Sequence, residues 1–209
     1  MLRNIRVFYS AIRKDFQSIG AIAPSSSLLA KAIVNPLAQR PPGPVSVLEV
    51  GPGTGSFTSR ILEHLREGDH LDIFELNPKF SLFLRRSLQK AGLGERGIGW
   101  ELFNADIRTL DKPVQYDYII SGLPLNNFHP STVAEILDIL IDHLSPAGVL
   151  SYFEYVLLHN FRARILRTTD RERVVGVINT VRTFNQKYQY DCNHVWWNLP
   201  PARARHCRK

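Results

Sequence analysis

Cysteine is scarce in this 209-residue sequence, which has only Cys192 and Cys207 and therefore no disulfide framework. The histidines are scattered without metal-ligand spacing, so we predict no metal site. No apolar run approaches the roughly 20 residues of a membrane-spanning helix, and the basic amino terminus lacks the apolar stretch of a secretion signal. We therefore expect a cytoplasmic protein in a reducing environment.

Acidic residues are also in short supply. The chain has 26 lysines and arginines against 19 acids, a formal net charge of +7. Such a protein is attracted to an anionic partner, either nucleic acid or a negatively charged membrane leaflet, and charge alone does not choose between them. With 44% hydrophobic residues, the chain has enough apolar surface for one sizeable core.

Apolar runs alternate with segments of helical periodicity along most of the chain. Predicted strands lie at 45–50, 70–75, 98–103, 116–121 and 149–155, and predicted helices at 57–66, at 79–91 and from a capping box at Thr132 and Glu135 to about Leu144. A basic helical stretch follows residue 156, and then two strands, the last at 188–199. This order predicts an α/β fold with a doubly wound, mostly parallel sheet that binds ligands beyond the carboxyl ends of its strands.

The sharpest chemical signal is a glycine-rich turn between the first predicted strand and helix. Its G-x-G-x-G spacing differs from the G-x-G-x-x-G of dinucleotide sites, and an acid precedes it. That acid repels phosphate and suits a ligand with an ammonium or sulfonium group, such as S-adenosylmethionine; an ordinary strand-to-helix turn is the alternative. The predicted cofactor residues of this turn are Glu49, Gly51, Pro52, Gly53, Thr54 and Gly55.

Polar residues also end the second and third predicted strands. Glu75 follows Gly55 by twenty residues, where a carboxylate accepts hydrogen bonds from ribose hydroxyls. Asn104, Ala105 and Asp106 end the third strand, where a carboxylate accepts from an adenine amino group. Ordinary surface acids are the alternative interpretation of both.

Five segments together resemble the bacterial phospholipid N-methyltransferases, which are class I S-adenosylmethionine-dependent enzymes with a Rossmann-like fold. The glycine turn matches their motif I, which many methyltransferases share, whereas the segments that begin at Gly20, Ser121 and Asn198 are much more specific. The segments are Gly20–Ser26, Leu48–Gly55, Glu75–Pro78, Ser121–Leu125 and Asn198–Ala202. The arginine-rich segment 159–187 departs from the family pattern.

The resemblance implies stepwise methylation of phosphatidylethanolamine toward phosphatidylcholine, with S-adenosylhomocysteine as the by-product. Related members act on ornithine lipids, so the head group stays open. The resemblance also places further residues at the cofactor, namely Ile22, Ser25, Leu76, Ser121 and Gly122. We place the domain boundary at the proline-rich residues 41–44, with an extension at 1–40 and the methyltransferase domain at 41–209.

The amino-terminal extension predicts an amphipathic helix. Leu2, Ile5, Phe8, Tyr9, Ile12, Phe16 and Ile19 share one face of a helical wheel, and basic residues cover the other. Such a helix lies in the head-group region of an anionic membrane, which suggests a peripheral protein on the inner face of the cell membrane. Packing on the sheet as core, or as a lid over the cofactor, is the alternative. The predicted membrane-binding residues are Arg3, Arg6, Phe8, Arg13 and Lys14.

Methyl transfer to an amine requires that the amine lose a proton, and several side chains are candidates for accepting it. The candidate catalytic residues are Tyr9, Ser121, Glu154 and Tyr155; His129 and water are alternatives. Aromatic residues such as Trp196 and Trp197 could hold a methylated cation by cation-π attraction or simply pack in a core or an interface.

Two other functions stay open. RNA adenine dimethylases share motif I and a basic surface, but they place Asn or Asp, then Pro, then an aromatic residue after the fourth strand, where this chain has Ser121–Leu125. We therefore expect no nucleic-acid partner, although an arginine run at 162–173 and the basic tail from Arg203 to Lys209 suit phosphates of RNA or of lipid. A lipid-binding module without turnover is the third possibility, and the intact cofactor set argues against it.

Overall fold

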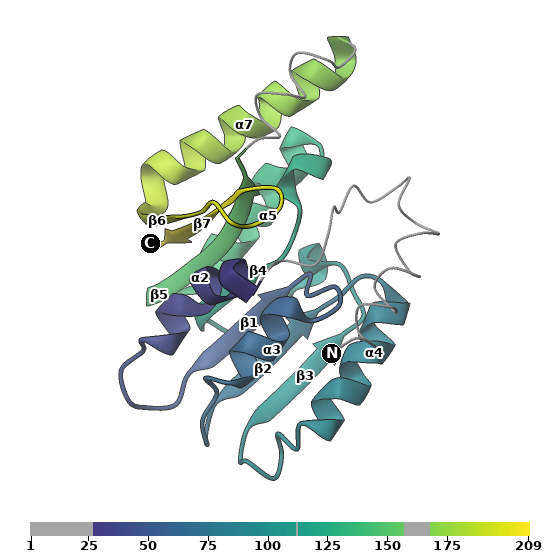
Figure 1. The fold of residues 1–209 in the computed structure, drawn as a ribbon, viewed down its shortest axis with the longest axis vertical. Helices are drawn as coiled ribbons and strands as arrows, with labels where there is room; N and C mark the ends of the chain where they lie inside the picture. Colours follow the sequence, from purple (N-terminus) through teal and green to yellow (C-terminus); the bar gives the residue numbers. More distant parts are fainter. Residues whose placement is uncertain (1–26, 112, 157–167) are drawn as a thin grey trace.

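The computed structural model describes residues 27–111, 113–156 and 168–209, and it contains one seven-stranded sheet with helices on both faces (Figure 1). The strand order is β3-β2-β1-β4-β5-β7-β6. Strands β1 to β5 pair in parallel, whereas β7 is antiparallel to both β5 and β6. The strands are β1 (Ser46–Val50), β2 (His70–Phe74), β3 (Gly99–Phe103), β4 (Tyr116–Ser121), β5 (Leu144–Tyr155), β6 (Gln189–Val195) and β7 (Ala202–Cys207).

The predicted doubly wound, mostly parallel α/β fold is confirmed. The helices are α2 (Ser27–Ala38), α3 (Ser56–Leu62), α4 (Pro78–Lys90), α5 (Pro130–Asp142) and α7 (Thr168–Tyr188), with 3-10 turns η1 (Ile107–Thr109) and η2 (Leu125–Asn127). None of the described helices is both long and apolar enough to cross a membrane.

The sheet separates two apolar cores because successive strand residues point to opposite faces. On one face, Val47 of β1 and Phe153 of β5 join the buried side chains of α2, α3 and α4. On the other face, Leu48 of β1 and Tyr152 of β5 join those of α5 and α7. A residue's place along a strand therefore decides which set of helices it meets.

Helix α2 is the described part of the predicted amino-terminal extension, and it packs on the sheet. Leu29, Ile33 and Leu37 recur at helical spacing and are fully buried or nearly so in the core that also holds α3. Residues 27–38 are thus part of the same core as the sheet, while the predicted amphipathic helix at residues 2–19 lies outside the described residues. The proposed membrane contact of that helix stays a prediction.

Four sequence predictions of element boundaries were wrong. The helix predicted at 57–66 is α3, which ends at Leu62. Helix α5 begins after His129, whose ring nitrogen accepts from the Ser131 amide, so the capping box at Thr132 is not used. Strand β5 begins at Leu144, opposite Tyr116, instead of at 149. The strand predicted at 188–199 ends at Val195.

The last strand, β7, lies where the sequence suggested a basic tail. Its residues alternate between small apolar side chains and arginines, a pattern that resembles a solvated tail. In the sheet, β7 lies between β5 and β6, and Ala202 and Ala204 are buried against the α2 side. Arg203 and Arg205 consequently point to the opposite face, toward α7.

A buried ion pair holds the amino-terminal edge of the sheet. The guanidinium of Arg40 donates to Asp69, and both side chains are fully buried. Asp69 also accepts from the backbone amides of Val45, at 2.9 Å, and Arg66, at 2.6 Å. This pair therefore joins the end of the α2 segment to the starts of β1 and β2.

We expect Arg40→Ala to lower the free energy of unfolding by about 3–5 kcal/mol, because it leaves the Asp69 carboxylate buried without its cation. The control is Arg60→Ala, which breaks the solvent-exposed pair with Glu63 and should cost no more than about 1 kcal/mol. Urea unfolding of both variants measures the difference. Equal losses in the two variants would contradict a structural role for the Arg40–Asp69 pair.

Candidate cofactor site and active edge

The loops that follow β1, β2 and β4 meet at the carboxyl edge of the sheet. The amide of Gly51 donates to the Phe74 carbonyl at 2.8 Å, and the amide of Gly122 donates to the Val50 carbonyl at 2.7 Å. The amide of Glu75 in turn donates to the Phe103 carbonyl at 3.0 Å. These bonds bring together loops that carry predicted site residues, and the longest of them, from Gly122 to Val50, spans 72 positions in the chain.

The glycine turn has a backbone that other residues rarely adopt. Gly51, Gly53 and Gly55 all have positive φ, of 66°, 57° and 85°. A Cβ on Gly51 would lie 2.5 Å from the Leu123 side chain, whereas a Cβ on Gly53 would meet nothing within 4 Å. Gly53 therefore faces open space, as the part of a loop that approaches a ligand should.

The segment after β4 is in direct contact with this turn. A Cβ on Gly122 would lie 2.5 Å from the carbonyl oxygen of Gly51, so only glycine allows this approach. Ser121, the last residue of β4, is almost fully buried, and its hydroxyl accepts weakly from the Leu123 amide at 3.4 Å. The structure thus joins predicted cofactor residues of β1 and β4, with Ser121 and Gly122 beside the turn.

Glu49 is a buried acid at the carboxyl end of β1. Its side chain is fully buried, and neither carboxyl oxygen has a hydrogen-bond partner among the described residues. Burial raises the pKa of Glu49 from 4.5 to about 8; the neighbouring Thr58 opposes this rise, and the nearby charge of Glu75 adds a smaller contribution to it. A buried carboxylate without a partner is costly, and a cationic ligand group would compensate it.

Glu75 lies beside the glycine turn in a defined orientation. One carboxylate oxygen accepts from the Gly53 amide at 2.9 Å, and the other accepts from the Asn77 amide at 2.7 Å. Burial raises the pKa of Glu75, and these backbone bonds oppose that rise. Leu76 follows with 66% of its side chain exposed, so an apolar surface adjoins the carboxylate.

The residues after β3 differ in what they contact. The side-chain amide of Asn104 donates to the carbonyls of Glu75, at 2.8 Å, and Leu76, at 3.0 Å, so it shapes the loop after β2. Ala105 packs against the core on the α5 side. The sequence predicted Asn104 as a contact of the cofactor, whereas in the structure its side-chain amide positions the loop after β2.

Asp106 has a partner that sequence reasoning missed. Both of its carboxylate oxygens accept from Arg108, through the guanidinium and the backbone amide, and this guanidinium lowers the pKa of Asp106. Arg108 also reaches Glu135 of α5 at 3.4 Å. An adenine amino group would have to share or displace these contacts. The spacing of two residues between Asp106 and Arg108 was the signal available in the sequence.

The candidate catalytic residues on β5 lie on opposite faces of the sheet. Tyr155 is buried beside Phe153 on the α2 side, and burial raises its pKa, so its phenol stays protonated near neutral pH. Glu154 points toward α7 and is ion-paired with Arg205. Both residues stay candidates for the proton acceptor.

Several predicted residues lie outside the described residues, so the structure does not place them. They are the catalytic candidate Tyr9, the cofactor candidates Ile22 and Ser25, and the membrane candidates Arg3, Arg6, Phe8, Arg13 and Lys14. Within the predicted arginine run, Arg173 is described, and its guanidinium donates to the carbonyls of Asn126 and Phe128. Arg173 therefore joins α7 to the loop after β4.

The described residues fit S-adenosylmethionine. Glu49 offers an uncompensated buried carboxylate for a cation, Gly53 borders open space, and Glu75 retains acceptor capacity on oriented oxygens. When bound, this cofactor supplies an electrophilic methyl group on a sulfonium. Fold and site together are those expected of a class I S-adenosylmethionine-dependent methyltransferase.

The comparisons with known proteins agree with this class. A family model described as "Methyltransferase domain" matches residues 47–148, from β1 into β5. Ornithine lipid N-methyltransferase of Singulisphaera acidiphila is 22% identical over 156 residues, which cover 72% of this chain and 77% of that protein.

Two solved structures show the same fold. An O-methyltransferase from Bacillus cereus, solved in complex with SAH, aligns with a TM-score of 0.66 and 14% identity, covering 99% of this chain and 91% of the other. The CurJ carbon methyltransferase aligns with a TM-score of 0.58 and 16% identity. The alignment covers 88% of this chain and 54% of the other. The family model and the residues at the carboxyl edge support S-adenosylmethionine as the cofactor, and the methyl acceptor is a separate question.

We expect the stability of the cofactor-free protein to fall as pH rises from about 5 to about 8, because Glu49 binds its proton more tightly folded than unfolded. Above the pKa of Glu49 in the folded protein, its buried charge destabilises the fold in full. Below the pKa of Glu49 in the unfolded chain, it does not destabilise the fold at all. Glu49→Gln should therefore be more stable than wild type by a few kcal/mol at pH 8 and nearly equal to it at pH 4.5. Denaturant unfolding across this range measures the gap. A gap that does not change with pH would exclude Glu49 as its source.

We expect Gly53→Ala to weaken binding of S-adenosylhomocysteine by about tenfold or more, because the new methyl group enters the open space beside the turn. The backbone strain at φ 57° should cost only about 1–2 kcal/mol of stability. The control is Gly43→Ala, another positive-φ glycine with open surroundings, located before β1 at the opposite edge. Calorimetric binding that is unchanged in Gly53→Ala would remove this turn from the cofactor site.

Proposed function

We propose that this methyltransferase N-methylates the amine head group of a membrane lipid, with ornithine lipid as the first candidate and phosphatidylethanolamine as the second. The observation that carries the proposal is an exposed apolar hairpin at the same sheet edge as the cofactor residues. A lipid substrate requires such a surface, because the enzyme must reach an amine that stays at the membrane interface.

The hairpin joins β6 to β7 and lies beyond the carboxyl end of β5. Ala202, the first residue of β7, pairs with Tyr155, the last residue of β5. The amide of Val156 donates to the Pro201 carbonyl at 2.8 Å. Because β4 and β5 run in parallel and Ser121 pairs with Tyr152, the hairpin projects from the edge where β4 also ends.

The tip of the hairpin exposes large apolar side chains in an ordered turn. Trp197 is 89% exposed, Leu199 84% and Trp196 62%. Asn198 between them is buried, and its side-chain amide donates to the Pro200 carbonyl at 2.7 Å. Tryptophan is enriched at membrane interfaces because its ring is apolar and its N–H stays hydrated. The tip therefore suits insertion into the head-group region.

The choice of an amine lipid has separate support. The similarity to an ornithine lipid N-methyltransferase covers about three quarters of both chains, and the motifs at Ser121–Leu125 and Asn198–Ala202 resemble phospholipid N-methyltransferases. In the proposed reaction the amine lone pair attacks the methyl carbon, the C–S bond breaks with its electron pair on sulfur, and a proton leaves the nitrogen. Water or one of the candidate residues would take that proton.

The decisive test is label transfer from methyl-labelled S-adenosylmethionine to anionic vesicles that contain either ornithine lipid or phosphatidylethanolamine, with structured RNA as a parallel substrate. We expect label in the organic phase with at least one amine lipid. Label in the RNA would replace the proposal with a nucleic-acid methyltransferase, and label in neither would exclude both amine lipids as substrates.

We expect Trp197→Ser to weaken binding to anionic vesicles by about tenfold or more, since burial of a large apolar side chain contributes about 1.5–3 kcal/mol. Affinity for S-adenosylhomocysteine should not change. The control is Leu82→Ser on α4, which removes an apolar side chain that is 52% exposed away from the hairpin. Vesicle sedimentation measures both. If the two variants lose the same affinity, the hairpin is not the membrane contact.

A further inference from the structure

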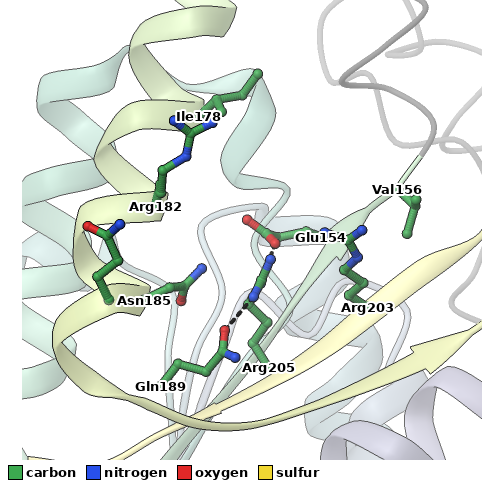
Figure 2. Close-up of a pocket in the computed structure, with 9 residues that line it drawn as sticks. Glu154, Val156, Ile178, Arg182, Asn185, Gln189, Arg203 and Arg205 are labelled. Atoms are coloured by element: carbon green, nitrogen blue, oxygen red, sulfur yellow. Dashed lines mark hydrogen bonds and ion pairs between the residues drawn. The ribbon is translucent and has the colours of Figure 1, made fainter.

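A second polar site lies on the α7 face of the sheet. A cavity of about 560 Å³ separates α7 from β5 and β7, and Figure 2 shows its side chains converging from the helix and the strands. It is distinct from the glycine turn, none of whose residues line it. The lining residues that matter for its chemistry are Glu154, Arg182, Asn185, Gln189, Arg203 and Arg205.

The cavity carries an excess of positive charge. Three arginines line it against one carboxylate, and Arg205 is already held by Glu154 and Gln189. Arg203 differs from Arg205, because its Nε is buried and has no hydrogen-bond partner within the part of the chain that the structure describes. Arg182 lines the same cavity from α7.

An unpaired buried guanidinium N–H is costly, and a bound oxyanion would compensate it. Leaving a buried donor without an acceptor costs about 1–3 kcal/mol, and more for a charged group. A planar guanidinium matches the paired oxygens of a phosphate or a carboxylate in a bidentate contact. The amides of Asn185 and Gln189 add neutral hydrogen-bonding groups to the lining. The chemistry of the cavity therefore favours a small anion.

The position of the cavity connects it to the active edge. Glu154 and Val156 line it, and they lie just beyond Tyr152, the β5 residue that pairs with the end of β4. The residue opposite Glu154 on β7 is Arg203, four positions after the exposed Leu199 of the hairpin tip. A lipid head group at the hairpin would thus have the cavity on one side and the carboxyl edge of β4 on the other.

We propose that this cavity binds the anionic group of the zwitterionic lipid substrate, the carboxylate of an N-acylated amino-acid lipid or the phosphate of a phospholipid, while the amine extends toward the cofactor. The inference rests on the proposed function, since it assigns the second charge of the same substrate. Arg203 and Arg182 attract the anionic group. The Glu154–Arg205 pair forms part of the cavity wall and leaves the positive charge of the other two arginines uncompensated.

Arg203→Gln tests the proposal in the enzyme reaction. We expect its KM for the amine lipid in vesicles to rise by about tenfold or more, because a charged contact is lost. Its affinity for S-adenosylhomocysteine and its unfolding midpoint should stay close to wild type. Arg86→Gln on α4 removes the same charge from an exposed position outside the cavity, and it should leave KM unchanged. Equal KM values for the two variants would overturn the proposal while leaving the lipid reaction intact.

Direct binding separates this inference from the proposed function. Calorimetry on the wild type, saturated with S-adenosylhomocysteine, would use three soluble probes: O-phosphoethanolamine, Nα-acetylornithine and inorganic phosphate. We expect at least one amine-containing probe to bind more tightly than inorganic phosphate and to lose that affinity in Arg203→Gln. No binding, or equal binding by both proteins, would overturn the anion site. Phosphate that binds as tightly as the amine probes would show a free-phosphate site and overturn the head-group assignment.

If the wild type methylates no amine lipid but Arg203→Gln still loses probe binding, the failure belongs to the proposed lipid reaction and the anion site stands. Arg182→Gln provides an independent check, because its backbone is on α7 instead of in the sheet and its side chain is exposed. This variant should weaken binding of the same probe without loss of stability.

Discussion

The active edge depends on one close approach between two loop backbones. The carbonyl oxygen of Gly51 occupies the position that a side chain on Gly122 would need, and the Gly122 amide donates to Val50. Strands β1 and β4 are adjacent, with β2 and β5 on their outer sides. This contact therefore lies at the topological switch point of the sheet, where the order in which strands are added reverses. The turn that faces the cofactor and the loop after β4 are therefore held as one unit, and any ligand beyond the strand ends meets both.

The central part of this arrangement could be predicted from the sequence because its signals are local. Buried parallel strands are short apolar runs, so β1, β2, β3 and β4 were located to within one residue at each end. The glycine turn and Glu75 follow such runs directly, and the parallel order of the strands brings their carboxyl ends to one edge. The periodicity of α4 likewise located that helix to within one residue.

The remaining features depend on contacts between distant residues, and local patterns do not show them. Strand β7 is recognisable only when β5 and β6 lie on either side of its arginines, and Glu154 meets Arg205 across 51 positions. Asp106 looked like a free acceptor in the sequence, yet a guanidinium two residues away occupies it. The hairpin tip contains Trp197, which could equally have packed in a core, and only its position beyond β5 distinguishes the two.

The sheet also sorts charge between its two faces. Glu49 shares the α2 and α3 face with Val47, and there its carboxylate is buried without a partner, while Arg203 and Arg205 point to the α7 face, where the guanidinium Nε of Arg203 is unpaired. A cationic cofactor and the anionic group of a zwitterionic substrate would thus be attracted to opposite faces of the same edge. The substrate amine, attached to that anion, would then have to cross the carboxyl edge near the ends of β4 and β5 to reach the methyl group. Such an arrangement favours substrates that carry a negative group close to their amine, and it disfavours simple amines, which the cavity would not hold.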